Sequence, residues 1–235
     1  MRLVVLSGAL LSAMVTAGQA QVGYEPSESP YRDITKGKSL TFLVGYFGGN
    51  GGSLGLGPHN GMTVGGRFDI SVGGTIQLGF GFSVGDLERL IIRPNTDTIP
   101  GLETIGPIPQ QVLMFDFTAQ VNLTGAKSWK RLAPYFSATV GLALGEDSPL
   151  NTGDFVFGNK IYLTPGFGTR VMLSQTFHLR LEARAQFWKL GYPPSFTVGS
   201  TPGQWVVSPW LQAGLGVSRI YPFPPKLLMA SFPSP

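Results

Sequence analysis

The side chains of this chain that could do chemistry are charged or imidazole groups placed at every second position of apolar segments. His178, Arg180, Glu182 and Arg184 follow this spacing between Phe177 and Trp188. In a β-strand, residues two apart point to the same face, so these groups share one side of the sheet. The full set predicted to point inward comprises Arg67, Asp69, Asp116, Arg170, His178, Arg180, Glu182 and Arg184.

This set predicts a network of buried ion pairs. If the turn before Phe177 centres on Gln175, Arg170 lies directly opposite Arg180. Two like charges face to face are unfavourable, so a carboxylate must lie close. Glu182 is one pleat away, and Asp69 and Asp116 can reach from other strands. Two alternatives remain open, namely a narrow gated ion path and a binding site for an anionic ligand.

Catalysis needs a different arrangement. A serine hydrolase pairs the hydroxyl with a histidine base and an acid. His178, Ser208 and Glu182 are the only set that could be assembled in this way, and nothing in their spacing places them within hydrogen-bond reach. His59 lies in a Gly-Pro-His-Asn stretch typical of a turn. We therefore expect no enzyme, no metal site and no cofactor.

Composition narrows the class of protein. The chain has 235 residues with 33 glycines, 19 prolines and no cysteine, and only 13% of its residues are charged. The absence of cysteine excludes disulfides, thiolate metal sites and a cysteine nucleophile. The formal net charge of +4 comes from scattered basic residues, which argues against a nucleic-acid partner. The length allows one domain with a full core or one closed barrel.

Alternation of apolar and polar residues is the strongest structural signal. From Thr75 to Val84, apolar residues occupy every second position, and threonine, glutamine, glycine and serine fill the others. Such a pattern indicates a strand with one apolar face. Eight segments show it: Leu40–Phe47, Met62–Ile70, Thr75–Val84, Leu113–Leu123, Tyr135–Leu144, Ile161–Leu173, Phe177–Trp188 and Trp205–Val217. Pro165 and Pro209 interrupt the pattern in two of these segments.

The connections between these segments alternate between short and long. Short links lie around Val72–Gly73 and Ser174–Thr176, with a modest one at Thr124–Ala133, whereas four long, Gly-rich and Pro-rich links span 48–60, 85–110, 145–159 and 189–203. Short turns at one end and long loops at the other are typical of outer-membrane barrels. The second long link is unusually apolar and could form a hydrophobic lid over the barrel mouth, with Leu90, Ile91, Ile92, Ile99, Leu102, Ile105 and Ile108.

The apolar face of each segment runs for about ten residues, which matches the height of a bilayer crossed by tilted strands. We therefore predict an all-β, eight-stranded antiparallel up-and-down transmembrane barrel with a polar interior. The alternative is a soluble sandwich or barrel that buries the apolar face. Aromatic residues near the segment ends fit the girdles of a membrane interface, as in Tyr46, Phe47, Trp129, Tyr135, Phe187, Trp188, Trp205, Trp210 and Tyr221.

The ends of the chain predict export. Arg2, an apolar stretch from Leu3 to about Val15, and Gly18-Gln19-Ala20 form the pattern of a signal peptide over residues 1–20. We expect a periplasmic segment at 21–38, the barrel at 39–220, and a Pro-rich periplasmic tail at 221–235. Because the chain enters the barrel on the side of the short turns, both termini are predicted to be periplasmic.

With this strand count, loop asymmetry and leader, the chain resembles the small eight-stranded outer-membrane barrels of Gram-negative bacteria, the family of OmpX, OmpW and the transmembrane domain of OmpA. Gln212–Val217, followed by Ile220 and Tyr221, is similar to the final strand that the barrel assembly machinery reads in that family. The resemblance implies outer-membrane lipid, lipopolysaccharide and this machinery as partners, and a monomer. We expect envelope integrity or surface interaction through the loops. OmpW-like barrels suggest one alternative, a narrow channel for small or hydrophobic solutes. The other alternative, from the His178, Ser208 and Glu182 set, is a lipid-modifying hydrolase.

Overall fold

The computed structural model describes residues 28–34, 37–94, 102–146, 148–196 and 203–218. The predicted signal peptide, most of the predicted segment at 21–38 and the predicted Pro-rich tail lie outside these ranges, so their assignments stay predictions. Among the described residues no helix is long and apolar enough to cross a bilayer.

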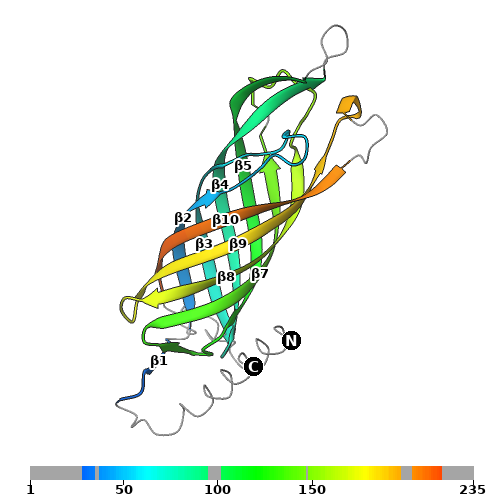
Figure 1. Ribbon diagram of the computed structural model, residues 1–235. Coiled ribbons are helices and arrows are strands. Elements are labelled where there is room, and N and C mark those ends of the chain that lie inside the picture. Colours follow the sequence, from blue (N-terminus) through cyan, green and yellow to red (C-terminus); the bar gives the residue numbers. More distant parts are fainter. Residues whose placement is uncertain (1–27, 35–36, 95–101, 147, 197–202, 219–235) are drawn as a thin grey trace, which may run out of the picture.

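The protein is a closed antiparallel β-barrel in which each strand is bonded to its neighbours in sequence (Figure 1). The barrel closes where the last strand pairs with the first, at Trp210↔Phe47 through Val217↔Leu40. The predicted fold class and all eight predicted strands are confirmed. The strands are β2 (Lys38–Phe47), β3 (Gly61–Gly73), β4 (Ile76–Pro94), β5 (Leu102–Asn122), β7 (Leu132–Gly145), β8 (Asn159–Met172), β9 (Phe177–Gly191) and β10 (Gly203–Val217).

The two ends of the barrel differ. At one, which we call the turn end, β2 begins, β10 ends, and short links join β3 to β4 and β8 to β9. Two three-residue strands, β1 (Tyr31–Asp33) and β6 (Lys127–Trp129), pair with each other there. The other end, the loop end, carries the longer connections, including a single 3-10 turn at Pro194–Phe196 among the described residues.

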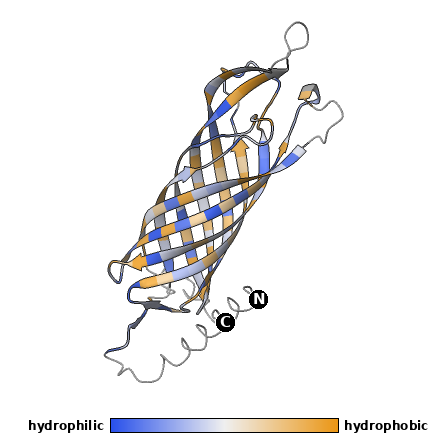
Figure 2. Cartoon of the chain, viewed as in Figure 1, coloured by the Kyte–Doolittle hydropathy of each residue, from blue (hydrophilic) through white to orange (hydrophobic). Residues whose placement is uncertain are grey.

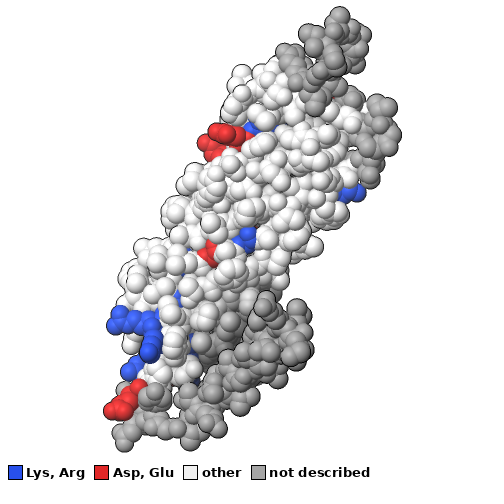
Figure 3. Space-filling model, viewed as in Figure 1, with Lys and Arg blue, Asp and Glu red and all other residues white. Residues whose placement is uncertain are grey.

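Alternate residues of every strand point outward, and most of these outward residues are apolar, so the outer wall is apolar. The colouring along the strands shows this alternation (Figure 2). In the space-filling view the middle of the visible face has few charged atoms, and basic and acidic residues gather toward the ends (Figure 3). A soluble protein rarely exposes so large a contiguous apolar surface. Exposed apolar residues of the wall include Leu40, Phe42, Val44, Val64, Phe80, Phe82, Leu113, Phe115, Phe117, Phe136, Val140, Leu163, Phe167, Leu181, Leu211 and Leu215.

One predicted connection is wrong. Residues 85–110 were expected to form a long loop, but β4 continues to Pro94 and β5 begins at Leu102. The two strands pair as a hairpin that extends the wall at the loop end (Figure 1). The pairing register shifts between Arg89 and Ile91, and this bulge breaks the alternation that the sequence prediction relied on.

The two prolines expected to interrupt strands lie inside continuous ones. Pro165 faces Ala138 of β7, and on its other side the β8–β9 pairing passes directly from Leu163 to Gly166. Proline has no N–H to donate, so a gap in one ladder is the expected consequence. Pro209 accepts a hydrogen bond from the Gly48 N–H, at 2.8 Å, where β2 leaves the wall.

Candidate functional site

The lumen contains a compact cluster of buried ion pairs, which we call the ion-pair layer: Arg67, Asp69, Asp116, Arg180, Glu182 and Arg184. Glu182 on β9 is its centre. Arg180 Nε donates to Glu182 Oε2 at 2.9 Å, and Arg184 Nε lies 3.0 Å from Oε1. Tyr135 and Ser137 of β7 donate their hydroxyls to the same carboxylate, at 3.1 and 2.9 Å. Four neighbouring groups thus hold one carboxylate in place.

The layer also connects opposite walls. Asp69 on β3 accepts from Arg67 Nε at 2.8 Å and from Arg180 Nη1 of β9 at 3.1 Å. The strands β3 and β9 are separated in the sheet by β2 and β10, so this contact crosses the lumen. Arg67 also lies 3.7 Å from Glu182, and Arg184 lies 3.7 Å from Asp116. Every member is at most 9% exposed.

Arg170 lies directly opposite Arg180 in the β8–β9 register, as the sequence indicated. Of the carboxylates expected near this pair, Asp69 and Glu182 contact Arg180, whereas Asp116 lies beside Arg184. Arg170 donates from Nη2 to the amide oxygen of Asn122 at 3.0 Å, and no described carboxylate is within ion-pair distance of it. His178 bonds hydroxyl groups at the turn end, with Nδ1 2.8 Å from Ser218 Oγ and Nε2 3.4 Å from Thr41 Oγ1.

Inward glycines make room for the large side chains of the ion-pair layer. Gly79 of β4 faces Asp69 of β3. A Cβ atom at Gly79 would lie 2.5 Å from Asp69 Oδ1 and 2.7 Å from Arg67 Nε. Gly81 similarly has the Asp116 carboxylate beside it. The small residues on the polar faces of the strands, which the sequence showed only as part of the alternation, therefore set the space available to the arginines.

The half of the lumen toward the loop end is filled by a different cluster, which we call the apolar plug. Trp188 lies at its centre, with its ring centroid 5.4 Å from that of Phe47 and 5.1 Å from that of Phe157. Side chains from the links at 48–60 and 146–158 fold into the mouth and complete it. Its buried members are Phe47, Leu56, Leu87, Ile92, Val112, Met114, Ala143, Phe155, Phe157, Tyr162, Trp188, Leu190, Val206 and Trp210.

The ion-pair layer and the apolar plug meet at Trp210. The Arg184 guanidinium lies over its ring, 5.4 Å from the centroid, and the indole N–H donates to Thr63 Oγ1 at 2.9 Å. Buried side chains therefore occupy the lumen both in the ion-pair layer and in the apolar plug. Sequence reasoning predicted the ion-pair layer and missed the plug.

The predicted position at the membrane interface is wrong for four aromatic residues. Phe47, Tyr135, Trp188 and Trp210 are at most 1% exposed and point into the lumen. Each lies on the same strand face as inward polar residues, as Trp188 does with Arg184. The alternation of residues along each strand therefore indicated that these four side chains point inward. Tyr46 and Trp205 are exposed on the outer wall, as expected for interface anchors. Trp129 is exposed in β6 at the turn end. Phe187 is partly exposed on that wall, and Tyr221 lies outside the described residues.

The predicted hydrophobic lid is not one surface. Ile91 and Ile92 are buried, with Ile91 against Gly153 and Ile92 against Gly55 of the two inward-folded links. Leu90 packs partly against the apolar plug, Ile108 is buried and Ile105 is 37% exposed. Leu102 begins β5, and Ile99 lies outside the described residues.

The possible catalytic set is not assembled. Ser208 faces Gln186, whereas His178 faces Gly216, so the two side chains are separated along the barrel axis. The hydroxyls that His178 contacts belong to Ser218 and Thr41. Among the described residues no group of three or more histidine, aspartate or glutamate side chains could hold a metal ion. His59 lies in the link at 48–60, where its Nε2 is 3.0 Å from the Gly55 carbonyl oxygen.

Comparisons with known proteins agree on the fold. No protein-family model and no curated protein matches the chain. Among solved structures, Neisserial surface protein A is similar over 81% of this chain and 98% of its own, with 14% identity and a TM-score of 0.51. The outer-membrane protein OprG of Pseudomonas aeruginosa matches over 79% and 97%, with 12% identity and a TM-score of 0.48. The N-terminal barrel domain of OprF from the same organism matches over 77% and 97%, with 11% identity and a TM-score of 0.45.

At such low identity the likeness to Neisserial surface protein A concerns the fold alone. Together with the closed sheet and the apolar wall, it defines the class: this is a small eight-stranded β-barrel with the architecture of bacterial outer-membrane proteins.

Proposed function

We propose that this protein is a non-enzymatic outer-membrane barrel with a closed lumen, which supports the envelope and interacts through its loop end. The observation that carries this proposal is the filling of the lumen. The ion-pair layer and the apolar plug close it in succession, while the middle of the wall presents mainly apolar side chains to lipid. The surfaces left for contact with other molecules are the two ends.

The loop end has features of an interaction surface. Leu150 and Val156, in the link at 146–158, are 59% and 50% exposed although neighbouring Phe155 and Phe157 are buried in the plug. Anchored links of this kind hold exposed apolar residues in fixed positions, which lowers the entropy lost on binding. These features favour surface interaction over transport.

Two introduced cysteines test the proposed span and orientation, because the chain has none of its own. Ser53 is exposed at the loop end and Gln175 is exposed in the β8–β9 turn at the turn end. We expect a membrane-impermeant maleimide to label S53C on intact cells and to label Q175C only after the outer membrane is opened. The parent protein, lacking cysteine, is the blank.

Labelling of Q175C alone on intact cells would invert the proposed orientation. Labelling of neither variant on intact cells, with both labelled after outer-membrane permeabilisation, would place the protein in the periplasm. Either result contradicts a role at the cell surface.

A further inference from the structure

The buried charges of the turn-end half of the lumen do not balance. Four arginines face three carboxylates, and every carboxylate is engaged by the other arginines. Protonation of His178 would only enlarge the excess. A buried charge without a counter-charge is costly, so an anion beside it is stabilising. The four arginines are Arg67, Arg170, Arg180 and Arg184, and the three carboxylates belong to Asp69, Asp116 and Glu182.

The unbalanced charge lies on Arg170. This residue is 3% exposed, its Nε is buried without a hydrogen-bond partner, and its one side-chain bond goes to the neutral amide of Asn122. Arg180 faces it across the β8–β9 ladder, and Gln120 donates to Asn122. The Asp69 carboxylate acts on Arg170 only from beyond ion-pair distance, because its direct partners are Arg67 and Arg180. Within the described chain, nothing neutralises this guanidinium directly.

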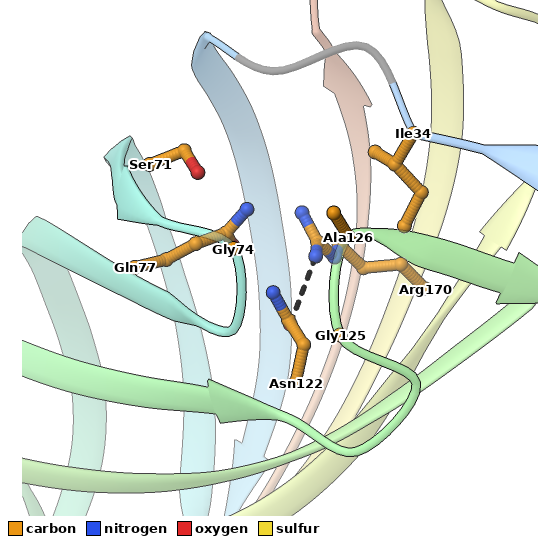
Figure 4. A pocket seen from close by; sticks show the side chains of 8 residues that line it. All are labelled: Ile34, Ser71, Gly74, Gln77, Asn122, Gly125, Ala126 and Arg170. Carbon is orange, nitrogen blue, oxygen red and sulfur yellow. Dashed lines mark hydrogen bonds between the residues drawn. The ribbon is translucent and has the colours of Figure 1, made fainter.

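A small cavity adjoins Arg170 at the turn end (Figure 4). The side chains of Arg170, Asn122 and Gln77 converge on it, and Ile34 and the 125–126 turn form its rim (Figure 4). Gln77 accepts the Gln120 amide N–H through its Oε1, which leaves its own NH₂ group as a donor. The cavity volume of ≈ 10 Å³ is room for a single water-sized particle.

We propose that this cavity is a site for one small monovalent anion of halide size, held by Arg170 and the Gln77 amide and entered from the turn end. A guanidinium and an amide NH₂ are both donors, which suits an anion and excludes a cation. A cavity of this size suits a monatomic anion. The bound anion supplies the counter-charge that Arg170 lacks, and so couples barrel stability to halide.

Purified protein in detergent, heated in sodium bromide or in sodium gluconate at equal ionic strength, tests this site. The temperature at which half of the folded electrophoretic band is lost is the midpoint of unfolding. We expect bromide to raise the midpoint saturably, by about 3–6 °C at about ten times its dissociation constant. R170Q removes the cation and should abolish this difference. K127Q, which removes an exposed cation of the same end, should retain it.

Asn122→Asp provides a second test that does not depend on R170Q. The Asn122 oxygen already accepts from Arg170 at 3.0 Å and from Gln120 at 2.8 Å, so an isosteric carboxylate there keeps both bonds and supplies the missing charge. N122D should raise the midpoint in gluconate and lose the bromide effect. If R170Q fails to fold, the response of N122D to bromide tests the proposal by itself. Equal midpoints of the parent in the two salts, or a bromide effect that persists in N122D, would overturn the proposal.

Discussion

Replacing Glu182 by glutamine lowers the free energy of unfolding by about 3–5 kcal/mol, because removing one partner of a buried ion pair leaves the others uncompensated. In this barrel the loss is shared by two arginines in direct contact, Arg180 at 2.9 Å and Arg184 at 3.0 Å. A third arginine, Arg67, also loses its longer contact with Glu182, at 3.7 Å. The amide keeps the shape of the side chain, so the effect reports charge rather than packing.

The measurement is urea unfolding of the purified protein in lipid vesicles, followed by the ratio of folded to unfolded electrophoretic bands. E88Q is the matched control, because Glu88 is an exposed carboxylate on β4 and its replacement should change stability by less than about 0.5 kcal/mol. If E182Q and E88Q unfold together, the ion-pair layer does not hold the walls of the barrel.

Replacing Trp188 by alanine should cost about 3–5 kcal/mol, the range for deleting a large aromatic side chain from a packed core. Trp188 is 1% exposed, and the rings of Phe47 and Phe157 lie against it. Its removal leaves a cavity in the apolar plug and frees the link at 146–158, which contributes Phe157. We therefore expect faster proteolysis of this link as well as lower stability.

Trp205 provides the comparison, since it is 62% exposed on the outer face of β10. W205A should cost no more than about 1–2 kcal/mol, because its ring contacts lipid headgroups rather than the plug. The same urea series measures both variants, and limited proteolysis of intact barrels measures release of the link. Equal losses for W188A and W205A, with no change in proteolysis, would mean that the plug is not a stabilising core.

The wall could be predicted from sequence because it follows one rule. Outward residues must be apolar to face lipid, so the strands repeat the same alternation and even the opposition of Arg170 and Arg180 followed from the length of one turn. The rule fails at the loop end. Between 85 and 110 the bulge near Arg89 shifts the alternation, and the extended hairpin therefore had the pattern of a loop.

The interior was only partly accessible to the same reasoning. Charged residues at alternate positions identified the members of the ion-pair layer, but not which arginine would lack a carboxylate, because that depends on distances across the lumen. The apolar plug was missed for a related reason. Leu56, Phe155 and Phe157 reach it from irregular links, where no period tells inside from outside.

Conductance of the reconstituted protein tests the closed lumen most directly. We expect barrels inserted in a planar lipid bilayer to add no current steps above the leak of the bare bilayer. The heat-dependent shift in electrophoretic mobility of the same preparation verifies that the barrels are folded. In the proposed arrangement the ion-pair layer and the apolar plug block the path in succession. Reproducible steps of uniform size, one for each insertion event, would contradict a closed lumen and identify the protein as a channel.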